Sequence, residues 1–377
     1  MLENIINKLK ESPLFNLSLS SKELFHSNFL YWLGNKYPNE FGKIFKKFLK
    51  IETDDNEAKD FQREKSNIDL SFKYKDGQQI LIENKVKSIP YIEQLQKYSK
   101  KHASDTNNNF ILLSLSEPKF INSDNKGNES TKWQYLSYKE LSDELLSMSD
   151  QISDGYHNQI VKDYCQFIDN LVEINNEIKL DSGMYFDFHS KVNRFYRELQ
   201  KIRLHDFYLK RIYELFAFHI YKEVENMTLE GNAELIGFGL PIKELWGNDN
   251  ESIFISHGMT RGQGLFDLKY KVSDHLLLGI QIQGDHYRMV VEDNNSQIAK
   301  KIKEELVKLG WFDFSESFPN QDIYPKGEKD FNKFGDNFFY KSVKLDPNLK
   351  IDKVSEIILN DIQKIMIINK EISNFEN

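Results

Sequence analysis

Hydrophobic and polar residues alternate most regularly between residues 67 and 86, and this pattern predicts a β-hairpin. Apolar residues occupy every second position of 68–74, the period of a strand with one buried face. A second apolar run, 80–86, follows a short turn at 75–77. Gly77 suits the last position of a three-residue loop, because that position usually takes a positive φ.

The length of the turn sets the register, and the register decides which side chains share a face of the hairpin. With the three-residue loop, Asp69 lies opposite Glu83, and Lys85 projects from the same face. A two-residue turn would set Asp69 opposite Asn84 instead, on the wrong face. We predict the three-residue loop, which brings two carboxylates and one ammonium group together.

This group of charges predicts a metal-dependent site. Asp69 and Glu83 side by side repel each other and raise each other's proton affinity unless a cation separates them. Mg2+, or Mn2+ as a substitute, meets that need because it prefers oxygen ligands and retains water molecules. Lys85 would orient a water molecule or neutralise charge on a phosphate. Taken alone, the same spacing also fits a cross-strand salt-bridge cluster on a solvated face.

The element after the hairpin is predicted to be a helix with a polar stripe. Pro90 suits its first turn. At helical spacing one stripe then contains Tyr91, Gln94, Leu95 and Tyr98. We therefore expect the Gln94 amide and the Tyr98 hydroxyl to face the same side of the helix.

Further helices and strands surround this hairpin in the first half of the chain. Helices are predicted at 1–10, 23–33, 38–50, 138–148 and 152–178, and strands at about 61–64, 110–115 and 133–136. Gly34 is expected to end the second of these helices. Residues 12–20 are expected to form a loop, and 116–132 a long polar loop.

Together these motifs resemble the PD-(D/E)xK nuclease superfamily, in particular a bacterial branch with the motifs NIDL, IENK and QL-x2-Y. The segments IDLSF, ILIENK and QLQKY carry the resemblance. ELFHSNFLYWL at 23–33 is similar to the opening helix of that branch. Ile68 stands where the superfamily's name has proline, which is a frequent variation. The resemblance covers roughly residues 20–145.

The resemblance implies a fold and an activity. The fold is of mixed α/β class, with a restriction-endonuclease-like αβββαβ core, and the activity is hydrolysis of phosphodiester bonds. By position, Asp69, Glu83 and Asn84 would hold the metal, the last through its carbonyl group. Lys85 would be the catalytic lysine.

Four further residues take roles by the same resemblance. Gln94 and Tyr98 would support the catalytic lysine and the substrate backbone. Glu23 would be a third carboxylate near the metal, although it also fits a capping box with Ser20, in which it bonds back to the helix N-terminus. His26, one turn further on, would join the active site, although a lone histidine on a helix is commonly structural.

Length and composition favour an intracellular protein of two domains. We expect a nuclease-like domain at 1–180 and an α+β domain at 181–377 that selects the target or binds a partner. The single cysteine, Cys165, excludes an intramolecular disulfide and fits the reducing cytoplasm. The chain contains no apolar run of about 18 residues, so we expect no membrane partner.

Charge is distributed unevenly along the chain. The net charge of -8 argues against a general polyanion-coating protein. Residues 1–103, however, contain 18 Lys+Arg against 14 Asp+Glu, a balance of +4, and the remainder has a balance of -12. Because the basic part coincides with the nuclease-like part, we expect it to bind nucleic acid, in particular DNA.

The second half of the chain predicts helices and a meander of strands. Helical patterns lie at 188–225, from about 296, and at 354–370, and strand patterns at 235–238, 252–257, 264–272 and 276–291. Four residues of this half are candidates for exposed functional side chains: Arg261, His286, Tyr287 and Arg288.

The sequence thus predicts a Mg2+-dependent endonuclease that acts on DNA in a bacterial restriction or anti-phage system. The alternative is a catalytically silent nuclease-fold protein that binds nucleic acid or a protein partner. Whether the protein forms a homodimer or acts with a partner from a defence system is left open by the sequence.

Overall fold

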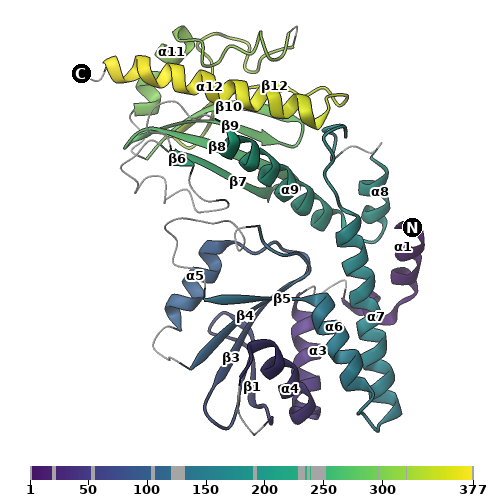
Figure 1. The fold of residues 1–377 in the computed structure, drawn as a ribbon. Helices are drawn as coiled ribbons and strands as arrows, with labels where there is room; N and C mark the ends of the chain where they lie inside the picture. The colour runs from purple at the N-terminus through teal and green to yellow at the C-terminus, as the bar shows by residue number, and fades with distance from the viewer. Residues whose placement is uncertain are drawn as a thin grey trace. The chain divides into compact units, whose positions relative to one another are not determined.

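The chain divides into two compact units, each built on its own sheet (Figure 1). The first unit contains the described residues up to Ile178 together with Glu198–Tyr208, and the second contains those of Lys179–Arg197 and Leu209–Asn377. This computed structural model describes residues 2–18, 23–51, 56–102, 107–119, 132–189, 193–227, 234–235, 238, 252–294, 298–319 and 321–375.

The first unit has a five-stranded mixed sheet in the order β1-β2-β3-β4-β5. Its strands are β1 (Lys59–Lys65), β2 (Ile68–Lys73), β3 (Gln79–Lys85), β4 (Asn108–Ser114) and β5 (Trp133–Ser137). The first three strands are antiparallel, and β4 and β5 continue the sheet in parallel. With α3 (Glu23–Lys36) before β1 and α5 (Ile92–Lys101) before β4, the predicted αβββαβ order is confirmed.

Helices cover both faces of this sheet (Figure 1). The remaining helices of the unit are α1 (Leu2–Glu11), α2 (Pro13–Ser18), α4 (Pro38–Leu49), α6 (Tyr138–Ser149) and α7 (Gly155–Glu177). On one face, Phe72 of β2 packs edge-on against Phe41 and Phe45 of α4. On the other face, α5 reaches Glu83 of β3 through Gln94. The sheet is therefore apolar toward α4, and its polar residues collect toward α5.

The hairpin of β2 and β3 adopts the predicted register. Leu70 lies opposite Ile82, and the same ladder sets Asp69 opposite Glu83. Gly77 ends the three-residue loop with φ +89°, a conformation that is strained for residues with a Cβ. The prediction of a three-residue turn is thus confirmed.

Two predictions of element boundaries in this unit are wrong. Gly34 does not end its helix, since α3 continues to Lys36. A Cβ at this position would lie 2.3 Å from the Phe61 ring, so the glycine permits close packing instead. The predicted loop at 12–20 contains the short helix α2, which buries Phe15. The chain at 120–131, predicted to be a polar loop, lies outside the described residues.

The second unit has a seven-stranded sheet in the order β11-β12-β10-β9-β8-β7-β6. Its strands are β6 (Glu234–Leu235), β7 (Ser252–Thr260), β8 (Gln263–Ser273), β9 (Leu276–Gln283), β10 (His286–Asp293), β11 (Asn332–Phe334) and β12 (Phe338–Lys344). The run from β7 to β10 is the expected meander, whereas β11 and β12 were not predicted from the sequence. Helices of this half are α8 (Arg194–Lys201), α9 (His205–Asn226), α11 (Ile298–Lys308) and α12 (Ile351–Phe375).

The two faces of the second sheet differ in polarity. Helices α9 and α12 pack on one face, where Phe216 contacts Phe266 with ring centroids 5.2 Å apart and the Tyr287 hydroxyl donates to Asp361 at 2.6 Å. Residues on the opposite face alternate with these, and they include Gln281 and Arg288. No described helix of either unit is long and apolar enough to cross a membrane.

Candidate active site

Asp69, Glu83 and Lys85 meet on the α5 face of the first sheet. The Lys85 ammonium lies 2.7 Å from Glu83 Oε1. Glu83 is only 2% exposed. Its other oxygen, Oε2, is buried and has no hydrogen-bond partner among the described residues. The cluster is therefore not the solvated salt bridge that the spacing alone would allow.

Burial and mutual repulsion change the proton affinities of these groups. Burial raises the pKa of Asp69 to about 6. Burial and the neighbouring Asp69 charge raise the pKa of Glu83 to about 7. Burial alone would lower the pKa of Lys85, but the charges of Glu83 and Asp69 raise it overall. Two carboxylates with raised pKa values and one protonated lysine form an environment that favours an additional cation.

Gln94 and Tyr98 of α5 lie over the same site. The Gln94 amide nitrogen donates to Glu83 Oε1 at 3.1 Å and to the Tyr98 hydroxyl at 2.8 Å. This amide fixes the orientation of the Glu83 carboxylate together with Lys85. Both residues thus lie where the helical stripe predicted them.

Asn84 ties β3 to the rest of the unit. Its backbone N–H donates to Asp69 Oδ2 at 2.7 Å, and its side-chain amide donates to the Glu23 carbonyl at 3.0 Å. The buried Tyr138 hydroxyl donates to Asn84 Oδ1. Because N–H and C=O of one residue in a strand point to the same edge, the Asn84 carbonyl points to the side of Asp69.

Glu23 holds the segment between β3 and α5. Its Oε1 accepts hydrogen bonds from the backbone N–H groups of Lys87 and Ser88 at 3.2 and 3.1 Å and from the Ser88 hydroxyl at 2.8 Å. Burial raises the pKa of Glu23, but these hydrogen bonds outweigh it, so the pKa is lowered overall. Residues 19–22, on which the alternative capping box depends, lie outside the described residues.

His26 lies behind the site, in an aromatic cluster. The side chain is 2% exposed, and Nδ1 lies 3.0 Å from the Tyr164 hydroxyl. Its ring packs edge-on against Tyr138, the residue that donates to Asn84. Burial lowers the pKa of His26 to about 3, so the ring is neutral at pH 7. From this position the ring supports Tyr138, and it does not reach the surface.

One further carboxylate, Glu64 of β1, was not predicted from the sequence. The pairing of Arg63 with Leu70 sets Glu64 opposite Asp69. Its charge contributes to the raised pKa values of both Asp69 and Glu83. The sequence feature that could have revealed Glu64 is the turn between β1 and β2. Residues 66 and 67 both have positive φ, and such a pair makes a tight hairpin whose register is fixed.

The residues present fit a small, hard cation held by two carboxylates and one carbonyl. Within the described part of the chain, no group of three or more His, Cys, Asp or Glu side chains is placed to hold a metal ion. Mg2+ does not need such a cage, because it commonly binds one or two carboxylates and keeps several waters. The unpartnered Glu83 Oε2 and the raised pKa values are what a cation would relieve.

A groove of about 510 Å³ lies next to the site, between α3 and β1. Its lining consists of Leu24, Asn28, Tyr31, Phe61, Gln62, Arg63 and Glu64. The Arg63 guanidinium lies 4.7 Å from the centre of the Tyr31 ring. On β1, the strand next to Asp69, the groove thus offers an exposed arginine beside half-buried aromatic and amide groups.

The fold and these side chains define a restriction-endonuclease-like domain. Residues 14–166 match the family model of the PD-(D/E)XK nuclease superfamily. The resemblance to this superfamily that the sequence motifs predicted is thus confirmed for this segment of the chain. Neither a curated protein nor a solved structure matches the chain. Members of this superfamily generally use divalent metal ions, and the family match indicates nuclease activity.

Proposed function

We propose that the protein is a metal-dependent nuclease whose site consists of Asp69, Glu83 and Lys85. The observation that carries the proposal is a pair of carboxylates with raised pKa values, one buried and one half-buried, beside a protonated lysine. A structural salt bridge would not need the second carboxylate, and removing two carboxylates from water beside a single cation is costly. A bound cation would offset this cost by neutralising the two carboxylates.

Each residue has a defined task in this proposal. Asp69, Glu83 and the Asn84 carbonyl hold the ion, with Mg2+ as the natural metal and Mn2+ as a substitute. When bound, the ion supplies Lewis-acid activation of water and of the scissile phosphate. The Lys85 ammonium neutralises negative charge that develops at the phosphate. Gln94 holds Glu83 Oε1 so that Oε2 is available as a ligand.

The remaining site residues hold this geometry. Tyr98 receives the second hydrogen bond of Gln94, and in this proposal its hydroxyl contacts the substrate backbone. Glu23 orders the segment after β3 through its hydrogen bonds to Lys87 and Ser88. In this proposal it is a third carboxylate near the metal. His26 acts through Tyr138 on Asn84.

We further propose that the substrate is DNA, cut internally, and that the setting is bacterial restriction or defence against phage. The basic balance of residues 1–103 supports a polyanionic substrate. The resemblance of the motifs to a bacterial branch of the superfamily supports the setting. Under this proposal the second unit selects the target or binds a partner.

The direct test is cleavage of supercoiled plasmid, linear duplex, single-stranded DNA and RNA by the purified full-length protein. Reactions contain Mg2+, Mn2+ or EDTA, and Asp69→Asn is compared with Asp76→Asn, which removes an acid from the turn of the same hairpin. We expect Mg2+-dependent nicking or linearisation of plasmid that Asp69→Asn abolishes and Asp76→Asn retains. Cleavage of RNA alone would overturn the DNA assignment. No cleavage of any substrate would favour the silent nuclease-fold alternative.

A further inference from the structure

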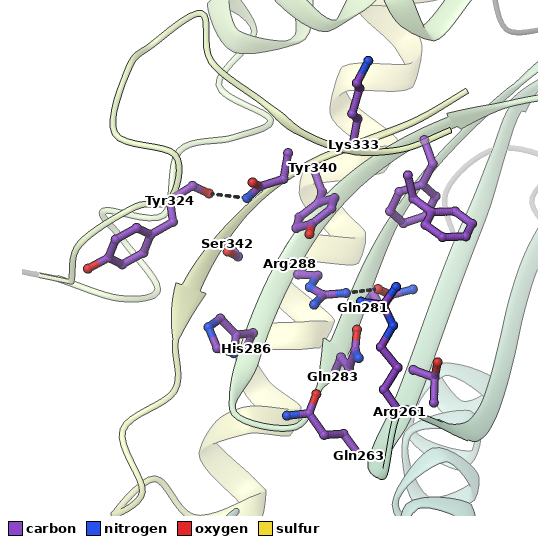
Figure 2. Close-up of a pocket in the computed structure, with 14 residues that line it drawn as sticks. Arg261, Gln263, Gln281, Gln283, His286, Arg288, Tyr324, Lys333, Tyr340 and Ser342 are labelled. Carbon is purple, nitrogen blue, oxygen red and sulfur yellow. Dashed lines mark hydrogen bonds between the residues drawn. The ribbon is translucent and has the colours of Figure 1, made fainter. Parts of the chain in front are cut away.

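The second unit has a hollow of about 710 Å³ on the face of its sheet opposite α9 and α12 (Figure 2). Its floor is a row of paired residues across β9, β10 and β12: Gln281, Arg288 and Ser342. Strand β11 and Tyr324 form part of the rim. Three of the four exposed candidates from the sequence, Arg261, His286 and Arg288, line this hollow, whereas Tyr287 is buried on the other face.

The lining is rich in cations and contains no acidic side chain among the described residues. Arg261 and Arg288 supply positive charge, in a half of the chain that is acidic overall. Figure 2 shows the Arg261 side chain extending toward Gln281 and Arg288, whereas the Lys333 side chain at the rim points away from them. The hollow therefore concentrates positive charge locally.

The acidic groups closest to the hollow already have cationic partners. Asp267 of β8 lies on the same face of the sheet, opposite Gln281, and 3.5 Å from Lys269, and its charge also acts on Arg288. Asp285, beside the hollow, lies 3.2 Å from Lys344. The exposed pair of Lys333 and Asp336 is 3.9 Å apart, a separation and exposure at which such a pair contributes little. The arginines are thus available to an anionic ligand.

Arg288 is held in place with part of its hydrogen-bonding capacity unused. One terminal nitrogen donates to Gln281 Oε1 at 2.7 Å, and the guanidinium lies 4.7 Å from the centre of the Tyr340 ring. Its Nε is buried without a hydrogen-bond partner among the described residues. A fixed guanidinium with free donors is suited to binding phosphate or a base edge.

Amide and aromatic side chains surround the arginines. Gln263, Gln281 and Gln283 present both donors and acceptors to the hollow, the combination that reads the edge of a nucleobase. Phe334 is 72% exposed at the rim, in a protein where large apolar side chains are otherwise mostly buried. An exposed ring beside cations is suited to stacking against a base.

We propose that this hollow binds a nucleotide unit, with its base against Phe334 and the glutamines and its phosphate against Arg261 and Arg288. Its volume falls within the usual range for a ligand of that size. A simple anion would use the arginines but not the exposed ring or the amides. An acidic peptide would use the cations but offers no planar group for Phe334. The unit can belong to a strand or be a free nucleotide.

The site lies within the second unit and does not depend on cleavage by the first. The test is therefore binding of fluorescein-labelled single-stranded DNA, RNA and duplex DNA to full-length protein in EDTA, followed by fluorescence anisotropy. Unlabelled nucleoside monophosphates and inorganic phosphate are added as competitors. The two proposals can therefore fail independently. Absence of plasmid cleavage would contradict the nuclease proposal alone, and absence of nucleotide binding in EDTA would contradict the proposal for this hollow alone.

Matched variants separate the hollow from general charge. Arg261→Gln removes one positive charge from the hollow, and Lys308→Gln removes one from an exposed position elsewhere in the unit. We expect the first variant to weaken binding by about tenfold or more and to reduce its salt dependence, and the second to change binding less than about twofold. Equal losses in the two variants would overturn the proposal.

The exposed ring gives a second, uncharged test. Phe334→Ala is compared with Tyr185→Ala, which removes another exposed aromatic side chain of the same unit, 57% exposed. Loss of stacking predicts about fivefold or greater weakening for Phe334→Ala only. Displacement by free monophosphates identifies a free nucleotide as the ligand, and displacement by oligonucleotides alone identifies a strand. Displacement by inorganic phosphate as effectively as by nucleotides contradicts the role of the base.

Discussion

Glu83 shows how burial of single residues creates chemistry in this protein. One of its oxygens is shared by Lys85 and Gln94, and the other has no hydrogen-bond partner among the described residues. A buried carboxylate in this state is destabilising unless something binds it. The residue is therefore poised to bind a cation at the expense of the stability of the metal-free protein.

Tyr138 is predicted to position β3, the strand that carries Glu83 and Lys85. Its hydroxyl donates to buried Asn84, whose backbone in turn holds Asp69. Tyr138→Phe leaves Asn84 Oδ1 unpaired and should lower the free energy of unfolding by about 1–3 kcal/mol. Urea unfolding measures this loss, with Tyr156→Phe as the control at a 73% exposed tyrosine. We also expect slower cleavage by Tyr138→Phe, and unchanged stability in this variant would contradict the positioning role.

Asp361 provides a test of pH dependence in the second unit. Burial raises its pKa to about 6, against opposing contributions from the Tyr287 hydrogen bond and Lys364, and Glu316 adds to the rise. Because the folded-state pKa is above the unfolded one, the stabilising contribution is complete near pH 4 and is lost as the pH rises through 6. Asp361→Asn imitates the protonated form at every pH.

We therefore expect Asp361→Asn to increase the free energy of unfolding at pH 7.5, by up to about 3 kcal/mol, and to change it little at pH 4. Urea unfolding at both pH values measures the difference. Asp352→Asn, at an exposed position near the start of the same helix, should give no gain at pH 7.5. A gain of equal size at both pH values would show that charge burial is not the cause.

The grouping of the main candidate site residues was predictable from the sequence because it depends on local geometry. The period of two places Asp69 and Glu83 on one face once Gly77 fixes the turn, and the helical period brings Gln94 and Tyr98 together. Glu23 is different, since its partners, Lys87 and Ser88, lie more than sixty positions away in the chain. No local pattern reports such contacts, nor the burial that keeps His26 neutral.

At the scale of elements, α3 illustrates packing that overrides local signals. Glycine commonly ends a helix, yet Gly34 lies inside α3 because the Phe61 ring occupies the place of a side chain. Strand β11 could not be predicted because its own pattern is weak. It is short and largely exposed, and it takes its conformation from pairing with β12. The strongly alternating strands β2 and β3 were predicted correctly because their own pattern suffices.

Gly34→Ala is predicted to destabilise the first unit. The new methyl group would lie 2.3 Å from Phe61, and overpacking of this kind costs about 1–3 kcal/mol, more than the gain of about 1 kcal/mol in helix propensity. Gly155→Ala is the control, because nothing lies within 4 Å of its added Cβ. Urea unfolding should show a loss for the first and none for the second, and a gain for Gly34→Ala would refute the packing explanation.

At the scale of the whole molecule, the two units are expected to respond differently to metal. In our proposal Mg2+ binds only the folded first unit. At a concentration one hundred times Kd it should raise the free energy of unfolding of that unit by about 2.7 kcal/mol and raise its unfolding temperature accordingly. Differential scanning calorimetry with and without Mg2+ measures the shift. Asp69→Asn should remove the shift and Asp76→Asn should keep it. A shift that survives Asp69→Asn would place the metal elsewhere.

The most direct test of the account is the rate of plasmid cleavage in Mg2+ by Lys85→Ala compared with Lys75→Ala. Both variants remove one lysine from the same hairpin, but only Lys85 lies beside Glu83. Loss of a positive group that stabilises transition-state charge typically costs about 100-fold or more. We predict a loss of that size for Lys85→Ala and wild-type rates for Lys75→Ala. Equal rates in the two variants would contradict the assignment of this site as the nuclease centre.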